Sequence, residues 1–180
     1  LHDFINLKRQ YEQELEKNSR NVEAHYRLGL AYLREPRDIE KAIEHLERAV
    51  ELDERNAEYH FHLAEAYSAD FSFANIFRMP FIAAKVKTHL EAAVKYNPQS
   101  SEYREGLIQY YTAAPAIMGG SFKKAHEQAE MIAYTDVYIS ILDHAGIYAE
   151  EGEREKATEL FRKAIRMRPK SWHDYQRFGT

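Results

Sequence analysis

The chain has 180 residues, of which 44% are hydrophobic and 30% charged, and its 25 basic and 29 acidic residues give a net charge of −4. This hydrophobic content excludes a disordered chain, and seven glycines and five prolines are too few for a collagen-like or linker-like sequence. The absence of cysteine excludes disulfide frameworks, thiolate metal sites and thiol catalysis, and the negative charge excludes an overall basic field for nucleic acid. The length fits one ordinary domain or an array of small repeats.

The N-terminal segment predicts a single amphipathic helix. Phe4, Leu7 and Tyr11 recur at helical spacing within residues 3–17, so we expect this helix to pack ahead of the rest of the chain. The chain begins at Leu1 rather than at a methionine, which indicates a processed or trimmed form. No stretch approaches the roughly 18 consecutive apolar residues of a membrane span, so we expect no such span.

Residues 21–170 contain four successive copies of one pattern, and each copy predicts a pair of helices. Each second helix is rich in alanine, glutamate and lysine, and each first helix reaches a tyrosine at the equivalent position. The four tyrosines are Tyr32, Tyr67, Tyr111 and Tyr148. A period of about 34 residues predicts that neighbouring pairs stack, because no single pair can bury its apolar face alone.

The copies resemble the tetratricopeptide repeat, whose pattern places an aromatic residue, Leu-Gly, Tyr, Ala, Phe and Pro at fixed positions. The first copy matches this pattern at His25, Leu28, Gly29, Tyr32 and Ala42. The other copies match it in the same register, at Leu63, Ala64, Tyr67, Leu90 and Pro98, at Leu107, Tyr111 and Ala125, and at Tyr148, Gly152, Ala157, Phe161, Ala164 and Pro169. The resemblance implies an all-α, right-handed superhelical solenoid of about four helix pairs with terminal cap helices.

The same resemblance implies one domain over residues 1–180. Its expected parts are an N-terminal cap helix (1–20), four repeats (21–55, 56–99, 100–134 and 135–170) and a C-terminal cap (171–180). The middle of the chain is similar to a bacterial, often exported subgroup in which a Pro-Gly-Ile-x-Gly-Gly-like loop interrupts a repeat, although Ala116 stands where that loop has glycine. This likeness slightly favours an extracytoplasmic (periplasmic) location over a cytoplasmic one.

Two insertions interrupt the repeats. The first, residues 69–81, holds four phenylalanines and a methionine where the family has a short polar turn. Two interpretations stay open: a lengthened helical hairpin whose aromatic side chains pack on the repeats, or the aromatic wall of a ligand or partner site. The second, residues 113–121, has a Gly-Gly pair before Ser121. Because the spacing of a phosphate-binding loop is absent, we interpret Ser121 as the N-cap of the next helix.

The nine histidines raise the question of a metal or acid–base site. His25 and His60 occupy the same position in successive repeats, which favours packing between helices. His60 and His62 point to nearly opposite faces of a helix, and His62 with Glu65 supplies only two ligands. The histidines predicted to be solvated, because charged residues surround them, are His45, His89, His126 and His173. The sequence therefore predicts no catalytic residue, no metal site and no cofactor.

Family resemblance supplies the candidate binding surface, because the first helix of each pair lines the concave face of such a solenoid. The residues that this places in the groove are Tyr26, Leu30, Leu33, Phe61, Glu65 and Gln109. We expect a non-enzymatic scaffold that binds a protein or peptide there, with no nucleic acid partner and an oligomeric state that the sequence leaves open. The alternative is a small-molecule or lipid-binding protein whose pocket is formed by Phe71, Phe73, Phe77, Met79 and Phe81.

Overall fold

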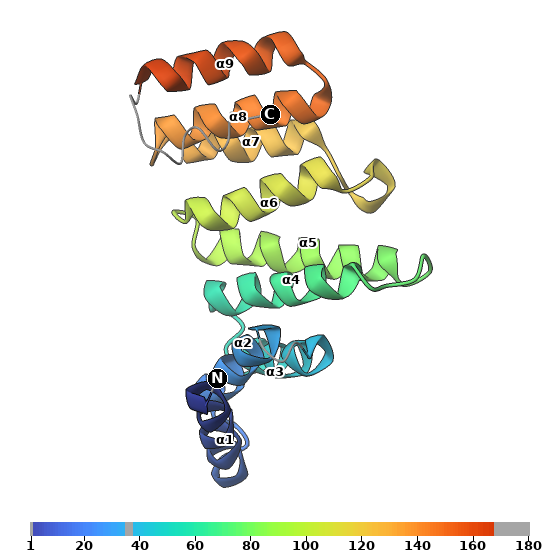
Figure 1. Ribbon diagram of the computed structural model, residues 1–180, viewed down its shortest axis with the longest axis vertical. Coiled ribbons are helices and arrows are strands. Elements are labelled where there is room, and N and C mark those ends of the chain that lie inside the picture. Colours follow the sequence, from blue (N-terminus) through green and yellow to red (C-terminus); the bar gives the residue numbers. More distant parts are fainter. Residues whose placement is uncertain (1, 35–37, 168–180) are drawn as a thin grey trace. The chain divides into compact units, whose positions relative to one another are not determined.

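The computed structural model describes residues 2–34 and 38–167, and every regular element in these ranges is a helix (Figure 1). In chain order they are α1 (His2–Lys17), α2 (Val22–Arg34), α3 (Ile39–Leu52), α4 (Ala57–Phe71), α5 (Met79–Tyr96), α6 (Ser101–Ala113), the 3-10 turn η1 (Ala116–Met118), α7 (Phe122–Ile132), α8 (Val137–Glu151) and α9 (Arg154–Met167). The all-α class and the helix pairs are therefore confirmed. The expected C-terminal cap (171–180), with His173, lies outside the described residues.

Short polar side chains begin the helices. Asp38, Asn56, Ser100, Ser121 and Asp136 each stand immediately before a helix, and the side-chain oxygen of each accepts a hydrogen bond from a backbone N–H of its first turn. Such caps satisfy amide groups that have no partner within the helix. The interpretation of Ser121 as an N-cap is confirmed, because its Oγ accepts from the backbone N–H of Lys124 at 3.3 Å.

The chain divides into two compact units, and the first, Leu1–Pro98, contains α1 to α5. Each helix packs on the next one, and α2 also contacts α4. Leu28, Leu46 and Leu63 are fully buried between these helices. Gly29 permits the close approach of α2 and α3, because a Cβ atom there would lie 2.5 Å from Leu46 Cγ.

The second unit, Gln99–Thr180, is described as far as residue 167 and contains α6 to α9. Its helices also pack in sequence, with a further contact between α6 and α8. Ile132 and Ile147 are fully buried, and a cluster of Tyr138, Ile141 and Leu142 on α8 packs against α9. No helix in the described ranges of either unit is long and apolar enough to cross a membrane.

The two insertions take different forms. The first lengthens the α4–α5 hairpin, because α4 continues to Phe71 and α5 starts at Met79, so that only residues 72–78 form the turn (Figure 1). The second is a closed turn around η1, in which Gly119 has a φ of 93° and a Cβ atom on Gly120 would lie 1.7 Å from the Ala114 carbonyl oxygen. Glycine is required at both of these positions.

Candidate functional site

Tyr26 belongs to an aromatic layer between α2 and α4 rather than to an open surface. Its side chain is only 3% exposed, and its ring centroid lies 4.7 Å from that of Tyr59 and 5.8 Å from that of His62. Its hydroxyl donates a hydrogen bond to Glu58 at 2.5 Å. Tyr26 therefore lies beneath the surface, and very little of its side chain can contact a partner.

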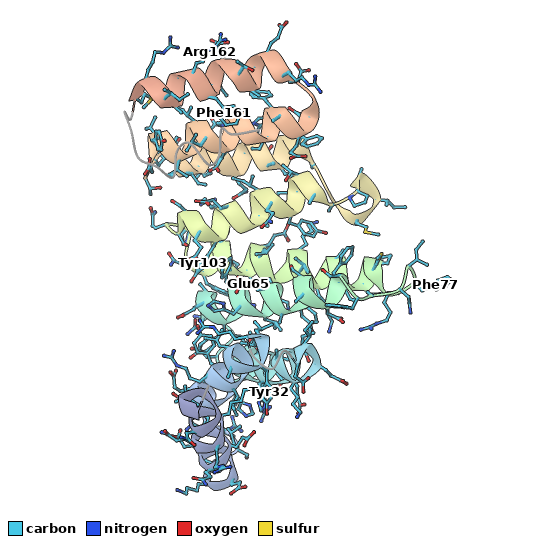
Figure 2. The ribbon with its side chains drawn as sticks, in the orientation of Figure 1. Tyr32, Glu65, Phe77, Tyr103, Phe161 and Arg162 are labelled. Carbon is cyan, nitrogen blue, oxygen red and sulfur yellow. The ribbon has the colours of Figure 1, made fainter. Side chains whose placement is uncertain are left out.

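Phe61 continues this layer on α4. It is 9% exposed and meets His62 edge to face, with ring centroids 5.6 Å apart. His62 Nδ1 lies 2.6 Å from a carboxylate oxygen of Glu65, so the predicted pairing of these two residues on one face is confirmed. Glu65 is an exposed residue of α4 (Figure 2).

Leu30 and Leu33 are the remaining two predicted groove residues in the first unit. Both are half-buried, and they follow Tyr26 at intervals of four and seven residues, which places all three on one side of α2. We call the surface formed by Tyr26, Leu30, Leu33, Phe61, His62 and Glu65 the α2–α4 face. The sixth predicted residue, Gln109, lies on α6 of the second unit, where its side chain is exposed.

Chemically, the α2–α4 face combines an apolar base with carboxylates at its edge. The side chains that a partner can reach are the leucines, His62 and Glu65, with Glu58 bound to the Tyr26 hydroxyl. The carboxylates of Glu58 and Glu65 attract a cation through their negative charge. The arrangement therefore suits a segment that carries an apolar residue next to a lysine or arginine.

The hairpin is lengthened as the first interpretation expects, but the packing that it expects is wrong for three of the four phenylalanines of the first insertion. Phe73, Phe77 and Phe81 are 72%, 83% and 75% exposed, and Figure 2 shows Phe77 at the end of the hairpin. Phe71 and Met79 are half-buried where the two helices end and begin. Phe73 and Phe77 lie in the turn at the end of the hairpin and Phe81 lies in the first turn of α5, so their side chains project into solvent.

Three histidine pairs within the described residues form a feature that the sequence did not predict. The facing Nδ1 atoms are 3.0 Å apart between His25 on α2 and His45 on α3. They are 2.9 Å apart between His60 on α4 and His89 on α5. The third pair, His126 on α7 and His144 on α8, has a separation of 2.6 Å. The prediction that His45, His89 and His126 are solvated is therefore wrong, because each is half-buried against a second imidazole.

Backbone carbonyls decide which ring nitrogen carries the proton in the first two pairs. His25 Nε2 lies 3.2 Å from the Ser19 carbonyl oxygen, and His60 Nε2 lies 3.0 Å from that of Glu54. A carbonyl oxygen can only accept, so each Nε2 carries a hydrogen, and the Nδ1 of the same neutral ring accepts from its partner histidine. Each of these two pairs thus joins two neighbouring helices through one N–H···N hydrogen bond.

Burial makes these pairs unfavourable sites for a positive charge. Burial, together with the neighbouring His60 and Lys85, lowers the pKa of His89 to about 4. Burial also lowers the pKa of His45 and of His144, and in each case the partner histidine adds to the effect. His45, His89 and His144 are accordingly neutral near pH 7, and each contacts a histidine on a neighbouring helix.

Two of the four repeat tyrosines, Tyr32 and Tyr67, make hydrogen bonds to the preceding helix. The Tyr32 hydroxyl donates to Glu12 at 3.0 Å, and the Tyr67 hydroxyl donates to Glu47. Lys85 Nζ donates to Tyr67 Oη at 2.6 Å. Burial, followed by the hydrogen bond to the carboxylate, raises the pKa of both tyrosines to about 12. Both hydroxyls are therefore protonated at neutral pH and serve to fix the packing of the helices.

Two segments of the chain match models of known repeats. Residues 38–70 match a model described as TPR repeat, and residues 140–171 match one described as tetratricopeptide repeat. Together with the helix pairs, these matches show that the chain contains tetratricopeptide repeats. Its likeness to the bacterial, often exported subgroup stays a prediction.

Solved structures share this fold. The crystal structure of MamA aligns with a TM-score of 0.72 and 24% identity over 92% of this chain and 88% of that one. YrrB, described as a TPR protein with an unusual peptide-binding site, aligns with a TM-score of 0.72 and 19% identity over 99% and 85%. TTC0263, a thermophilic TPR protein from Thermus thermophilus, aligns with a TM-score of 0.69 and 21% identity over 95% and 86%. No curated protein sequence matches the chain.

Proposed function

We propose that the chain is a non-enzymatic scaffold that binds a peptide segment of a protein partner on the α2–α4 face. The observation that carries this proposal is the aromatic layer between α2 and α4, with half-buried Leu30 and Leu33 on the same side of α2 as Tyr26 and with the nearby carboxylates of Glu58 and Glu65. A segment with an apolar side chain beside a lysine or arginine matches that surface in both shape and charge. The printed description of YrrB, a TPR protein with a peptide-binding site, supports peptide binding as a use of this fold.

The burial of Tyr26 and Phe61 determines which variants can test the proposal. Truncating either side chain would remove buried aromatic area and cost about 3–5 kcal/mol of stability, so lost binding would not be distinguishable from unfolding. Glu65→Lys and Leu33→Ser alter the reachable part of the face instead. Glu51→Lys on α3 is the matched control, because Glu51 is an exposed carboxylate of the same unit that lies outside the α2–α4 face.

A phage-displayed random peptide library selected on the folded protein supplies the probe. We expect the enriched peptides to carry a basic residue next to an apolar one. Glu65→Lys should weaken the binding of a synthetic copy of the best peptide at least about tenfold, which corresponds to about 1.4 kcal/mol. Glu51→Lys should leave that binding unchanged. Equal affinities for Glu65→Lys, Leu33→Ser and the unaltered protein would refute the assignment of this face.

The exposure of Phe73, Phe77 and Phe81 bears on the second candidate, a pocket for a small molecule or lipid. A pocket encloses most of the surface of its ligand between converging side chains. Side chains that are open to solvent favour contact with an external apolar surface instead.

A further inference from the structure

The turn of the α4–α5 hairpin and the first turn of α5 display large apolar side chains to solvent. Phe73, Ile76, Phe77 and Phe81 are 72%, 73%, 83% and 75% exposed, and all four lie within nine successive residues. We call these four residues, together with Arg78, the hairpin tip. Single exposed apolar residues are normal on a protein surface, but a contiguous group of this kind marks a site of contact with a partner or membrane.

Hydrogen bonds within the turn fix the backbone of the hairpin tip. Asn75 Oδ1 accepts hydrogen bonds from the backbone N–H groups of Phe77 and Arg78, both at 3.1 Å. The Arg78 guanidinium donates to Asp70 at 3.0 Å, and this contact joins the end of α4 to the start of α5. Ala74 is buried beneath the turn. The aromatic side chains therefore stand on a fixed backbone that directs them away from the helices, as Figure 2 shows for Phe77.

Carboxylates are missing from the sequence around the tip. The whole chain has 29 acidic residues in 180, yet the twenty residues between Asp70 and Glu91 contain none, whereas they do contain Arg78, Lys85 and Lys87. The ion pair at the turn presents its positive partner outward, because the Arg78 side chain is 60% exposed and the Asp70 side chain 19%. The Lys85 side chain is also more exposed than that of Glu47, with which it pairs. The outermost charges at this end of the hairpin are thus positive.

We propose that the hairpin tip docks the protein on an anionic lipid membrane. Phe73, Ile76 and Phe77 enter the boundary between headgroups and acyl chains, and Arg78 contacts lipid phosphates. Burial of apolar side chains together with attraction of cations to anionic lipid is the combination that holds peripheral proteins on a bilayer. The apolar groups project from a narrow turn, a shape that enters a deformable lipid surface directly. A protein would have to supply a hydrophobic groove to receive them.

Vesicle flotation tests this proposal. The probes are vesicles of phosphatidylcholine alone and vesicles of phosphatidylcholine mixed with phosphatidylglycerol. The unaltered chain should float with the mixed vesicles, and salt should weaken this association. The double variant Phe73→Ser/Phe77→Ser should lower the membrane partition coefficient at least about tenfold, because it removes the two aromatic side chains that the bilayer would bury. Arg78→Gln should lower the partition coefficient about fivefold on the mixed vesicles alone.

Tyr134→Ser is the matched control. Tyr134 is 83% exposed, as Phe77 is, but it lies close in sequence to the acidic residues Glu130 and Asp136. Since the altered side chains are exposed, all variants should keep the far-ultraviolet circular dichroism and melting temperature of the unaltered chain. Equal flotation of the Phe73→Ser/Phe77→Ser and Tyr134→Ser variants would overturn the proposal.

Tryptophan fluorescence provides a second readout that depends on insertion. The emission of Phe77→Trp should shift to shorter wavelength on the mixed vesicles, whereas that of Tyr134→Trp should not, each measured against the signal of the native Trp172. No flotation and no shift with either vesicle would overturn membrane docking. If the Phe73→Ser/Phe77→Ser variant then lost a protein partner, the tip would be a protein contact.

Discussion

The His60–His89 pair predicts a specific loss of stability in acid. An unfolded histidine takes up a proton with a pKa near 6.5, whereas burial lowers the pKa of His89 in the folded chain to about 4. The unfolded state therefore binds more protons between these values, so the contribution to stability is complete above pH 6.5 and is lost as the pH falls to 4. The full difference in pKa corresponds to about 3 kcal/mol, and partial access of water to the ring reduces the expected loss to about 2 kcal/mol.

His89→Phe is the variant that isolates this effect. A phenyl ring can keep the stacking against His60 and Tyr67, but it removes both the titrating group and the Nδ1 hydrogen bond. At pH 7 the variant should be about 1 kcal/mol less stable, because a half-buried hydrogen bond is lost. Between pH 7 and pH 4 it should lose about 2 kcal/mol less than the unaltered chain.

Urea unfolding followed by circular dichroism at a series of pH values measures these differences. Glu47 and Lys85 lie near His89 in both proteins, so their own titration cancels in the comparison. His62→Gln is the control for loss of one imidazole, since His62 faces Glu65 instead of a second histidine, and it should not flatten the pH dependence. Parallel stability curves for His89→Phe and the unaltered chain would refute the reasoning.

Three further predictions concern the packing of the helices, and thermal and urea unfolding test each of them. Gly29→Ala should cost about 1–3 kcal/mol, because its methyl group would overlap Leu46, whereas Gly146→Ala, which meets no atom within 4 Å, should stabilise α8 by about 0.5–1 kcal/mol. Equal effects of the two changes would contradict the close approach of α2 and α3. Gly120→Ala should destabilise the second unit by more than about 1 kcal/mol, since its Cβ atom would coincide with the Ala114 carbonyl; an unchanged melting temperature would show that the turn can rearrange. Asn56→Ala should cost about 1 kcal/mol through loss of the α4 cap, and Asn56→Asp should not.

The repeat pattern predicted the helices well because it reports on packing that is local in sequence. Small residues such as Gly29 and Ala42 mark where two helices meet, and the short polar residues at positions such as Asn56 and Ser121 mark where a helix begins. Both signals lie within a few residues of the structure that they specify. The all-α class, the helix pairs and the N-cap at Ser121 could therefore be predicted.

The histidine pairs could not be predicted because helical spacing gives the side of a helix on which a residue lies and not the side chain that faces it. His45 and His89 have charged neighbours along their own helices, which suggested solvation, yet each faces an imidazole of the preceding helix. A usable signal was present, since His25 and His60 recur at equivalent positions and a histidine follows each on the next helix.

The predicted packing of the phenylalanines of the first insertion was wrong for a related reason. Composition alone favours burial of aromatic side chains, but seven residues between two helices form a turn that is too short to fold back over them.

The predicted residues of the α2–α4 face are likewise of two kinds, buried and exposed. Tyr26 and Phe61 are buried by the helix on which they pack, whereas Glu65 is exposed, and only the structure separates these two groups.

The hydrogen bonds from Tyr32 to Glu12 and from Tyr67 to Glu47 define where a repeat can be removed. Each bond spans twenty positions and crosses from one helix to the first helix of the following pair. The two tyrosines are 35 positions apart, and so are the two glutamates. Excision of residues 21–55 would therefore bring Glu12 into the position that Glu47 now holds opposite Tyr67. The helix α1 thus presents the same hydrogen-bond acceptor as α3, and the first repeat can be removed as a block of 35 residues without leaving the Tyr67 hydroxyl unpaired.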